Sequence, residues 1–111
     1  MEIGKKSVDN VEIIPLNGRL DAYSSSQVEK TINSLIEDGK IKIVVNFKEI
    51  EYISSSGLRV MLASLKKLKK INGDIKLACL KPYVLEVFEI AGFTHLFDIY
   101  ESEEEAVNSL Q

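Results

Sequence analysis

The sequence predicts one α/β domain over residues 1–111, with a mixed, mostly parallel β-sheet, an N-terminal hairpin and about four helices packed on the sheet. β-Branched apolar runs alternate with segments whose apolar residues recur at helical spacing, which is typical of parallel crossovers. At 111 residues and 45% apolar composition, the chain can form one core but not two domains. Apolar residues on both sides of Asp9-Asn10 predict an antiparallel hairpin at the start.

The first half of the chain contains the predicted hairpin, one helix and one central strand. The hairpin pairs Val8 with Val11–Leu16, and residues 18–24 form a loop. The first helix begins at the capping-box pattern Ser26-Gln27-Val28-Glu29 and ends at Gly39. Its apolar stripe consists of Val28, Ile32, Leu35 and Ile36. Ile41–Phe47 is apolar and β-branched, as a buried strand should be.

The second half continues the alternation. A second helix begins at the serines 54–56 and ends near Ile71, before the helix-stop signal Asn72-Gly73. After a strand over Ile75–Leu80, a third helix begins at Pro82 and ends at Gly92. The predicted elements then close with a short strand over Phe97–Tyr100 and a helix from Ser102, where Ser102-Glu103-Glu104-Glu105 fits the capping box.

The segment Ser54-Ser55-Ser56 is the most informative part of the sequence. Leu58, Met61, Leu62, Leu65 and Leu68 follow it at helical spacing, so the serines occupy a helix N-terminus. A helix start has four unpaired N–H groups and carries about +0.5 of a charge. No Asp or Glu lies in this first turn, and Arg59 adds a positive charge. Three hydroxyls exceed what simple capping needs, and the arrangement favours an added phosphate.

Two motifs resemble those of a known family. Gly18-Arg19-Leu20-Asp21 is similar to the Gly-x-Leu-Asp segment of STAS domains, and Ser54-Ser55-Ser56-Gly57-Leu58 is similar to their Asp-Ser-Ser/Thr-Gly-Leu switch. Within that family the chain resembles the single-domain bacterial anti-sigma-factor antagonists, over nearly its whole length. The resemblance implies that Ser55 is the phosphoacceptor, with Ser56 and Ser54 as alternates. It also implies that Asp21, which could otherwise stabilise only a turn, lies near the acceptor in the partner's footprint.

The resemblance further implies a partner-switching function without a cofactor. The unphosphorylated form would bind an anti-sigma factor with serine-kinase activity and free the sigma factor, phosphorylation would break the complex, and a PP2C-type phosphatase would reset it. One departure favours an alternative: Ser54 replaces the family's Asp, an acid that could orient the acceptor hydroxyl or be read by a kinase. The alternative is a STAS-type module that does not switch and instead binds a small ligand or serves as a constitutive subunit.

Helical periodicity predicts the binding face. If Leu58, Met61, Leu62 and Leu65 face the core, a turn of 100° per residue places Val60, Ala63, Ser64 and Lys67 on the opposite side. Isolated exposed apolar residues are common, but beside the serines Val60 and Ala63 would form the centre of a small protein contact. The expected partner-binding residues are therefore Asp21, Ser54, Ser55, Ser56, Gly57, Arg59, Val60 and Ala63.

Composition and motifs argue against several other function classes. A serine hydrolase needs a base, and the one histidine, His95, lacks the neighbours of a triad. One His and one Cys cannot build a zinc site, and Cys79 lies in a run expected to be a buried strand. The net charge of −3 disfavours a nucleic-acid binder. With no 18-residue apolar stretch and no signal-peptide pattern, we expect a cytoplasmic protein without membrane contact.

Overall fold

A single six-stranded mixed sheet organises the chain. The structure is a computed structural model that describes all 111 residues. Its elements, in chain order, are β1 (Glu2–Ile3), β2 (Lys6–Val8), β3 (Val11–Leu20), α1 (Ala22–Glu37), β4 (Lys42–Ile53), α2 (Ser55–Lys69), β5 (Asp74–Ala78), α3 (Pro82–Ile90), the 3₁₀ turn η1 (Phe93–His95), β6 (Ile99–Tyr100) and α4 (Glu103–Leu110). None of these helices is long and apolar enough to cross a bilayer.

The sheet has an antiparallel opening and a parallel body, which confirms the predicted fold class. Its strand order is β1-β3-β4-β5-β6, and β2 also pairs with β3. β1 and β2 run antiparallel to β3, whereas the β3–β4, β4–β5 and β5–β6 pairs are parallel. Asp9 takes the left-handed conformation (φ 55°) in the β2–β3 turn, which Asp tolerates better than most residues. The predicted hairpin at Asp9-Asn10 is therefore correct.

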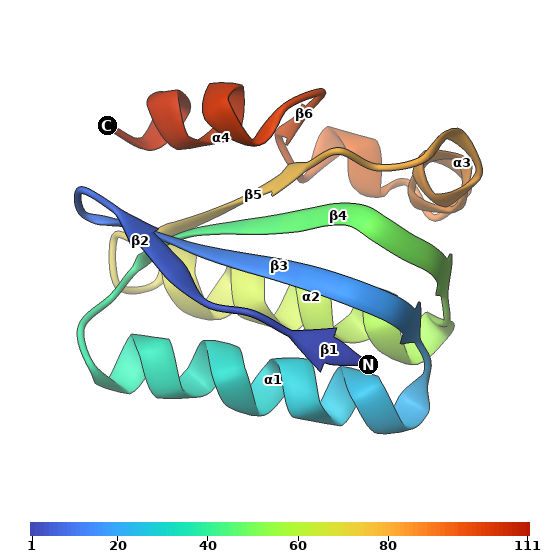
Figure 1. Ribbon diagram of the computed structural model, residues 1–111, viewed down its shortest axis with the longest axis horizontal. Helices are drawn as coiled ribbons and strands as arrows, with labels where there is room; N and C mark the ends of the chain where they lie inside the picture. The colour runs from blue at the N-terminus through green and yellow to red at the C-terminus, as the bar shows by residue number, and fades with distance from the viewer.

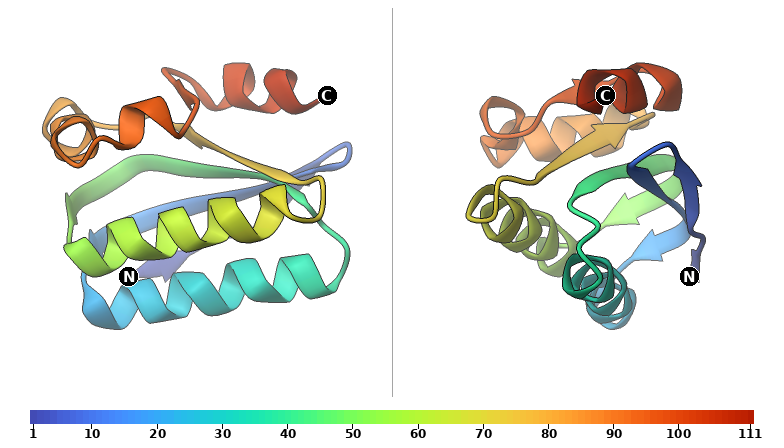
Figure 2. Two further views of the ribbon diagram at one scale, coloured as in Figure 1. Left: turned by 180° about the vertical axis from the view of Figure 1, so that it is seen from behind. Right: turned by 90° about the vertical axis from the view of Figure 1, so that its left-hand side faces the viewer.

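Helices cover both faces of the sheet. α1 and α2 lie side by side on one face and α4 packs on the other (Figures 1 and 2), whereas the buried side chains of α3 join the same core as those of α1 and α2. A main core of 20 buried residues joins the strands to α1, α2 and α3, and a smaller core of seven packs α4 on β3, β4 and β5. Because both faces are covered, the first half of β4 is apolar on both sides, and Ile43, Val44 and Val45 are all fully buried.

The β3–β4 pair is longer than predicted. β3 continues to Leu20 and β4 to Ile53, so the predicted loop over 18–24 and the predicted strand end at Phe47 are wrong. The pairing passes two register shifts, between Pro15 and Asn17 and between Gly18 and Arg19, before Leu20 pairs with Ile53. These irregularities break the two-residue alternation that identifies a strand in a sequence.

The first helix begins earlier than predicted. Asp21, not Ser26, is the N-cap of α1, and the capping box is formed by Asp21 and Ser24. Asp21 Oδ1 accepts from the Ser24 backbone N–H at 3.0 Å, and Ser24 Oγ accepts from the Asp21 N–H at 3.0 Å. The Ser26–Glu29 pattern therefore lies inside the helix, where its residues satisfy no helix end.

The remaining elements follow the prediction closely, apart from the end of β5. α3 begins with Pro82 at its first turn, and Ser102 caps α4 by accepting from the Glu105 N–H at 3.1 Å. Cys79, however, lies just past β5 rather than inside a buried strand. Its φ of 63° is in the left-handed region, and the side chain is only partly buried. The chain turns away from the sheet at this residue, so burial there is incomplete.

Candidate functional site at the start of α2

The two sequence motifs meet at one edge of the sheet. Leu20 and Ile53 are the last paired residues of the parallel strands β3 and β4, so Asp21 and Ser54 are the next residues on neighbouring strands. The Ser54 N–H donates to the Leu20 carbonyl at 2.9 Å, although the two residues are 34 positions apart. α1 and α2 therefore begin at the same end of the molecule (Figures 1 and 2).

The three serines have different hydrogen bonds. Ser54 is the N-cap of α2: its hydroxyl accepts from the Gly57 N–H at 3.2 Å and donates to the Leu20 carbonyl at 2.9 Å. Ser55, the first helical residue, is exposed and its hydroxyl makes no hydrogen bond within the chain. Ser56 is partly exposed and its hydroxyl is also unbonded. The Ser54 hydroxyl is thus engaged in structure, whereas those of Ser55 and Ser56 remain available.

The bonds of Ser54 also explain how a serine can replace an acid here. A carboxylate at this position could accept from the Gly57 N–H in the same way. It could not donate to the Leu20 carbonyl, because an ionised carboxylate carries no proton. The hydroxyl satisfies both groups.

We expect Ser54→Ala to lower the free energy of unfolding by about 1–2 kcal/mol, because the Gly57 N–H loses its acceptor at the helix start. Urea denaturation of the purified variant would measure the loss. Ser55→Ala is the matched control, since its hydroxyl bonds nothing, and it should change stability by less than about 0.5 kcal/mol. Equal effects of the two substitutions would contradict the capping role of Ser54.

Charges around the serines favour an anion on α2. Its first turn has no acidic residue, and the exposed Arg59 takes part in no ion pair. Asp21 is the N-cap of the neighbouring α1, where the hydrogen bond from the Ser24 backbone N–H, helped by the Ser24 hydroxyl, lowers the pKa of its carboxyl. Arg19 lies over the Tyr52 ring, 4.3 Å from the centroid, on the strands that lead into the site.

The predicted binding face on α2 is partly wrong, because α2 has two buried sides. Val60, expected to be exposed, is 9% exposed, and Ser64 is 4% exposed. The helix packs against α1 as well as the sheet, and the Lys67 ammonium donates to Asn33 Oδ1 of α1 at 2.8 Å. Ala63 is partly exposed. Small or short side chains four residues apart, Val60 and Ser64, were the available sign of a helix–helix contact.

Gly57 is also buried, and its role is to permit close packing. A Cβ there would lie 2.8 Å from Ile53 Cγ1 and 3.0 Å from two carbon atoms of Leu20. The first turn of α2 can approach the strand ends only because residue 57 lacks a side chain. Gly57 therefore shapes the site from beneath, and the exposed residues above it are Ser55 and Arg59.

A shallow cleft of about 310 Å³ lies between the N-terminal halves of α1 and α2. Its lining residues are Ala22, Ser25, Ser26, Glu29, Ser56, Arg59, Val60 and Ala63. Four of them were predicted from the sequence, and the α1 residues were not. Tyr23, also missed, is 77% exposed in the first turn of α1. The misplaced start of α1 hid these residues, since Ser26 and Glu29 were interpreted as a cap.

His95 and Cys79 lie away from the serines. His95 is in η1 and, with Cys79, lines a groove beside α3 that includes no residue of α1 or α2. No group of three or more His, Cys, Asp or Glu side chains is arranged to hold a metal ion. The site at the start of α2 thus consists of two free hydroxyls, one free cation and a cleft, an arrangement suited to binding and modification.

Comparisons with known proteins agree on one family. The model described as STAS domain matches residues 2–106. BtrV of Bordetella bronchiseptica, whose description assigns it provisionally to the anti-sigma factor antagonists, is 35% identical over 106 residues, which cover 96% of this chain and 91% of BtrV. The anti-sigma-B factor antagonist of Staphylococcus aureus is 25% identical and covers 94% of this chain and 96% of its own.

Solved structures show the same architecture. The anti-sigma factor antagonist SpoIIAA of Bacillus in its unphosphorylated form superimposes with a TM-score of 0.85 at 26% identity, over 97% of this chain and 95% of SpoIIAA. Its phosphorylated form gives a TM-score of 0.79 at 25% identity, over 99% and 100% of the two chains.

Proposed function

This chain belongs to the STAS domain family, and on that premise we propose that it acts as an anti-sigma-factor antagonist. In its unphosphorylated form it would bind an anti-sigma factor and so free a sigma factor. The names of two relatives that match more than nine-tenths of the chain support this function. The site also agrees with it, because Asp21, Tyr23, Ser55 and Arg59 are all exposed at one end of the molecule, as a protein-binding surface requires.

Ser55 is the proposed switch. Of the three serines, it alone is exposed, with a hydroxyl that bonds no other group of the chain. A phosphate there would add about −1.5 to −2 charges at the start of a helix whose dipole favours anions. The folded chain can therefore accept the modification without rearrangement. That SpoIIAA has been solved in both phosphorylated and unphosphorylated forms supports a switch of this kind.

The effect of the phosphate would fall on the complex rather than on the fold. Ser55 and Arg59 are exposed beside the cleft between α1 and α2, and Asp21 and Tyr23 are exposed at the start of α1. A partner covering these residues would take the phosphate out of water, which costs several kcal/mol unless the partner supplies matching cations. The kinase would be the anti-sigma factor itself, and a PP2C-type phosphatase would restore the binding form.

A constitutive STAS module that does not switch is the second candidate, and the Ser54 replacement is the observation that favours it. If the acid at this position were needed for phosphorylation, Ser54 would abolish the switch. The alternative is that the acid has a structural role that serine can fill, because the Ser54 hydroxyl caps α2 as a carboxylate would. Ser55 keeps its free hydroxyl in either case.

Displacement of a sigma factor tests the proposed function. Purified chain is added to a preformed complex of each candidate anti-sigma factor with its sigma factor, and free sigma factor is measured by size-exclusion chromatography. We expect one candidate to release its sigma factor and to co-elute with this chain. Ser55→Ala should release it as well, since it stays in the binding form. No release from any candidate would argue for the constitutive module.

A further inference from the structure

The helix α3 is unusually apolar for a helix at the surface. Only Glu86 and Glu89 are charged among its nine residues. Val84 and Phe88 point into the core, but Tyr83 is 51% exposed and Ile90 is 79% exposed. A helix that is apolar nearly all round is normally covered on all sides. On this chain no other element covers the outer side of α3.

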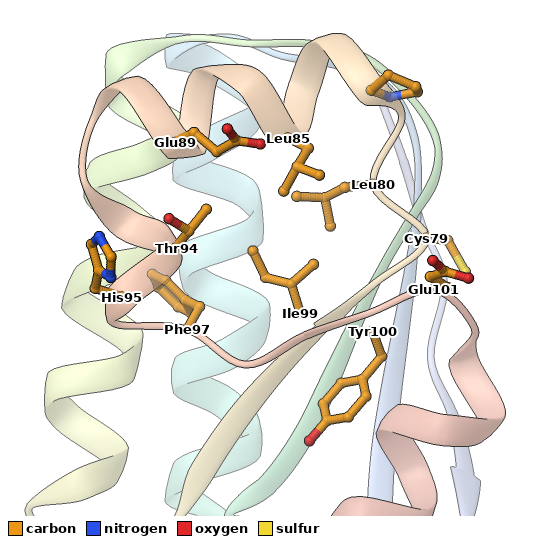
Figure 3. Close-up of a pocket in the computed structure, with 11 residues that line it drawn as sticks. Cys79, Leu80, Leu85, Glu89, Thr94, His95, Phe97, Ile99, Tyr100 and Glu101 are labelled. Carbon is orange, nitrogen blue, oxygen red and sulfur yellow. The ribbon is translucent and has the colours of Figure 1, made fainter.

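A groove lies directly beside this helix. It has a volume of about 890 Å³ and runs between α3, η1 and β6 (Figure 3). Its apolar lining includes Leu80, Leu85, Phe97 and Ile99. In Figure 3 the side chains of Leu80, Leu85 and Ile99 point into the same space. We call this groove the α3 groove; the exposed Tyr83 and Ile90 lie outside its lining.

The charges of the α3 groove are of one sign. Glu89 and Glu101 lie on two sides of it, and no Lys or Arg lines it (Figure 3). Neither carboxylate takes part in an ion pair. A third side of the groove is formed by His95, which is exposed. Two unpaired carboxylates beside an apolar floor repel phosphate-bearing ligands and attract cations.

We propose that the α3 groove is a docking surface for a protein segment that combines apolar side chains with Lys or Arg. Apolar side chains of the partner would fill the space between Leu85 and Ile99, and its cations would pair with Glu89 and Glu101. An amphipathic basic helix has this combination of side chains. Because no residue that lines the groove belongs to α1 or α2, such a partner would bind without covering the Ser55 site.

Peptide binding with charge-reversed variants tests the proposal. The probe is a fluorescent 14-residue Leu/Lys peptide with the pattern of an amphipathic helix, and its control is the same peptide with every Lys replaced by Glu. Fluorescence anisotropy should show that the Leu/Lys peptide binds the wild-type chain and the Leu/Glu peptide does not. Glu89→Lys combined with Glu101→Lys should weaken binding of the Leu/Lys peptide at least tenfold.

Two controls separate this site from general attraction and from the Ser55 site. Glu2→Lys combined with Glu37→Lys changes the net charge equally at exposed, unpaired residues on β1 and α1, and should weaken binding less than threefold. Ser55→Asp should leave peptide affinity unchanged, whatever becomes of the proposed antagonist function. Amide chemical-shift changes should concentrate between residues 79 and 101.

Three results would overturn the proposal. If Glu89→Lys/Glu101→Lys and Glu2→Lys/Glu37→Lys lower the peptide affinity equally, binding depends only on the net charge of the chain. Shift changes on α1 and α2 would place the peptide elsewhere. Concentration-dependent self-association that Leu85→Asp abolishes, and with which the peptide does not compete, would show that a second copy of the chain covers the groove.

Discussion

Ser55→Asp is expected to weaken the complex with the anti-sigma factor by about 100-fold or more. Each 1.4 kcal/mol is tenfold in affinity, and burying an unmatched carboxylate in an interface costs about 3 kcal/mol or more. The substitution should leave α2 intact, because an acid in the first turn of a helix is favourable by about 0.3–1 kcal/mol. Isothermal titration calorimetry would give the affinity, and circular dichroism would verify the fold.

Ser55→Asn is the matched control, since it has nearly the shape of Asp without the charge. It should bind within about fivefold of the wild type, a change of about 1 kcal/mol. If Ser55→Asp binds as tightly as the wild type, charge at residue 55 does not control the complex. If Ser56→Asp has the larger effect, the acceptor is the neighbouring serine, whose hydroxyl is also free.

Phe88→Ala is expected to have the largest effect on stability, a loss of about 3–5 kcal/mol. The Phe88 ring is fully buried and forms edge contacts with three other rings: Phe47 at 5.9 Å, and Phe93 and Phe97 at 6.1 Å between centroids. Its removal leaves a cavity that joins α3, η1 and β4. A domain of this size is stable by about 5–15 kcal/mol, so the variant should unfold at much lower urea concentration.

Ile90→Ala is the control on the same helix, because Ile90 is exposed and its removal creates no cavity. It should change the free energy of unfolding by less than about 0.5 kcal/mol. Both variants can be compared by urea denaturation followed by circular dichroism. A similar small loss for Phe88→Ala would mean that the aromatic cluster does not hold α3 on the sheet.

Local signals predicted most of the fold. α2, α3 and α4 combine an apolar stripe with a terminal residue of known preference: a serine cap, Pro82, or Ser102. These preferences depend only on neighbouring residues, so they can be recognised without the tertiary structure. The hairpin at Asp9-Asn10 was also predictable from neighbouring residues alone. The mixed sheet follows from the order of these elements.

Features that depend on distant contacts were not predictable in this way. The second half of β4 alternates irregularly because its pairing with β3 passes two register shifts. Val60 is buried by α1, and the sequence of α2 alone does not identify which helix lies beside it. The cap at Asp21 was missed because Ser24, its partner in the box, lies in a run of three serines in which Ser26 fits the usual pattern.

The candidate site was predictable where a motif carried it. The serine run and the Asp21 segment were recognisable by their sequence, and β3–β4 pairing brings them together. The sequence could not predict which of the three hydroxyls form hydrogen bonds. That difference depends on a tertiary contact, in which the Ser54 hydroxyl donates to the Leu20 carbonyl. That contact separates a structural serine from an available one, and it is the physical basis for choosing Ser55.

Phosphosite mapping tests the central claim most directly. The chain is incubated with ATP and each candidate serine-kinase anti-sigma factor, and then measured by intact-mass and peptide mass spectrometry. We expect one added phosphate, mapped to Ser55, and its loss on treatment with a PP2C-type phosphatase. No phosphate with any candidate, or a phosphate on Ser54 in place of Ser55, would contradict the proposed switch.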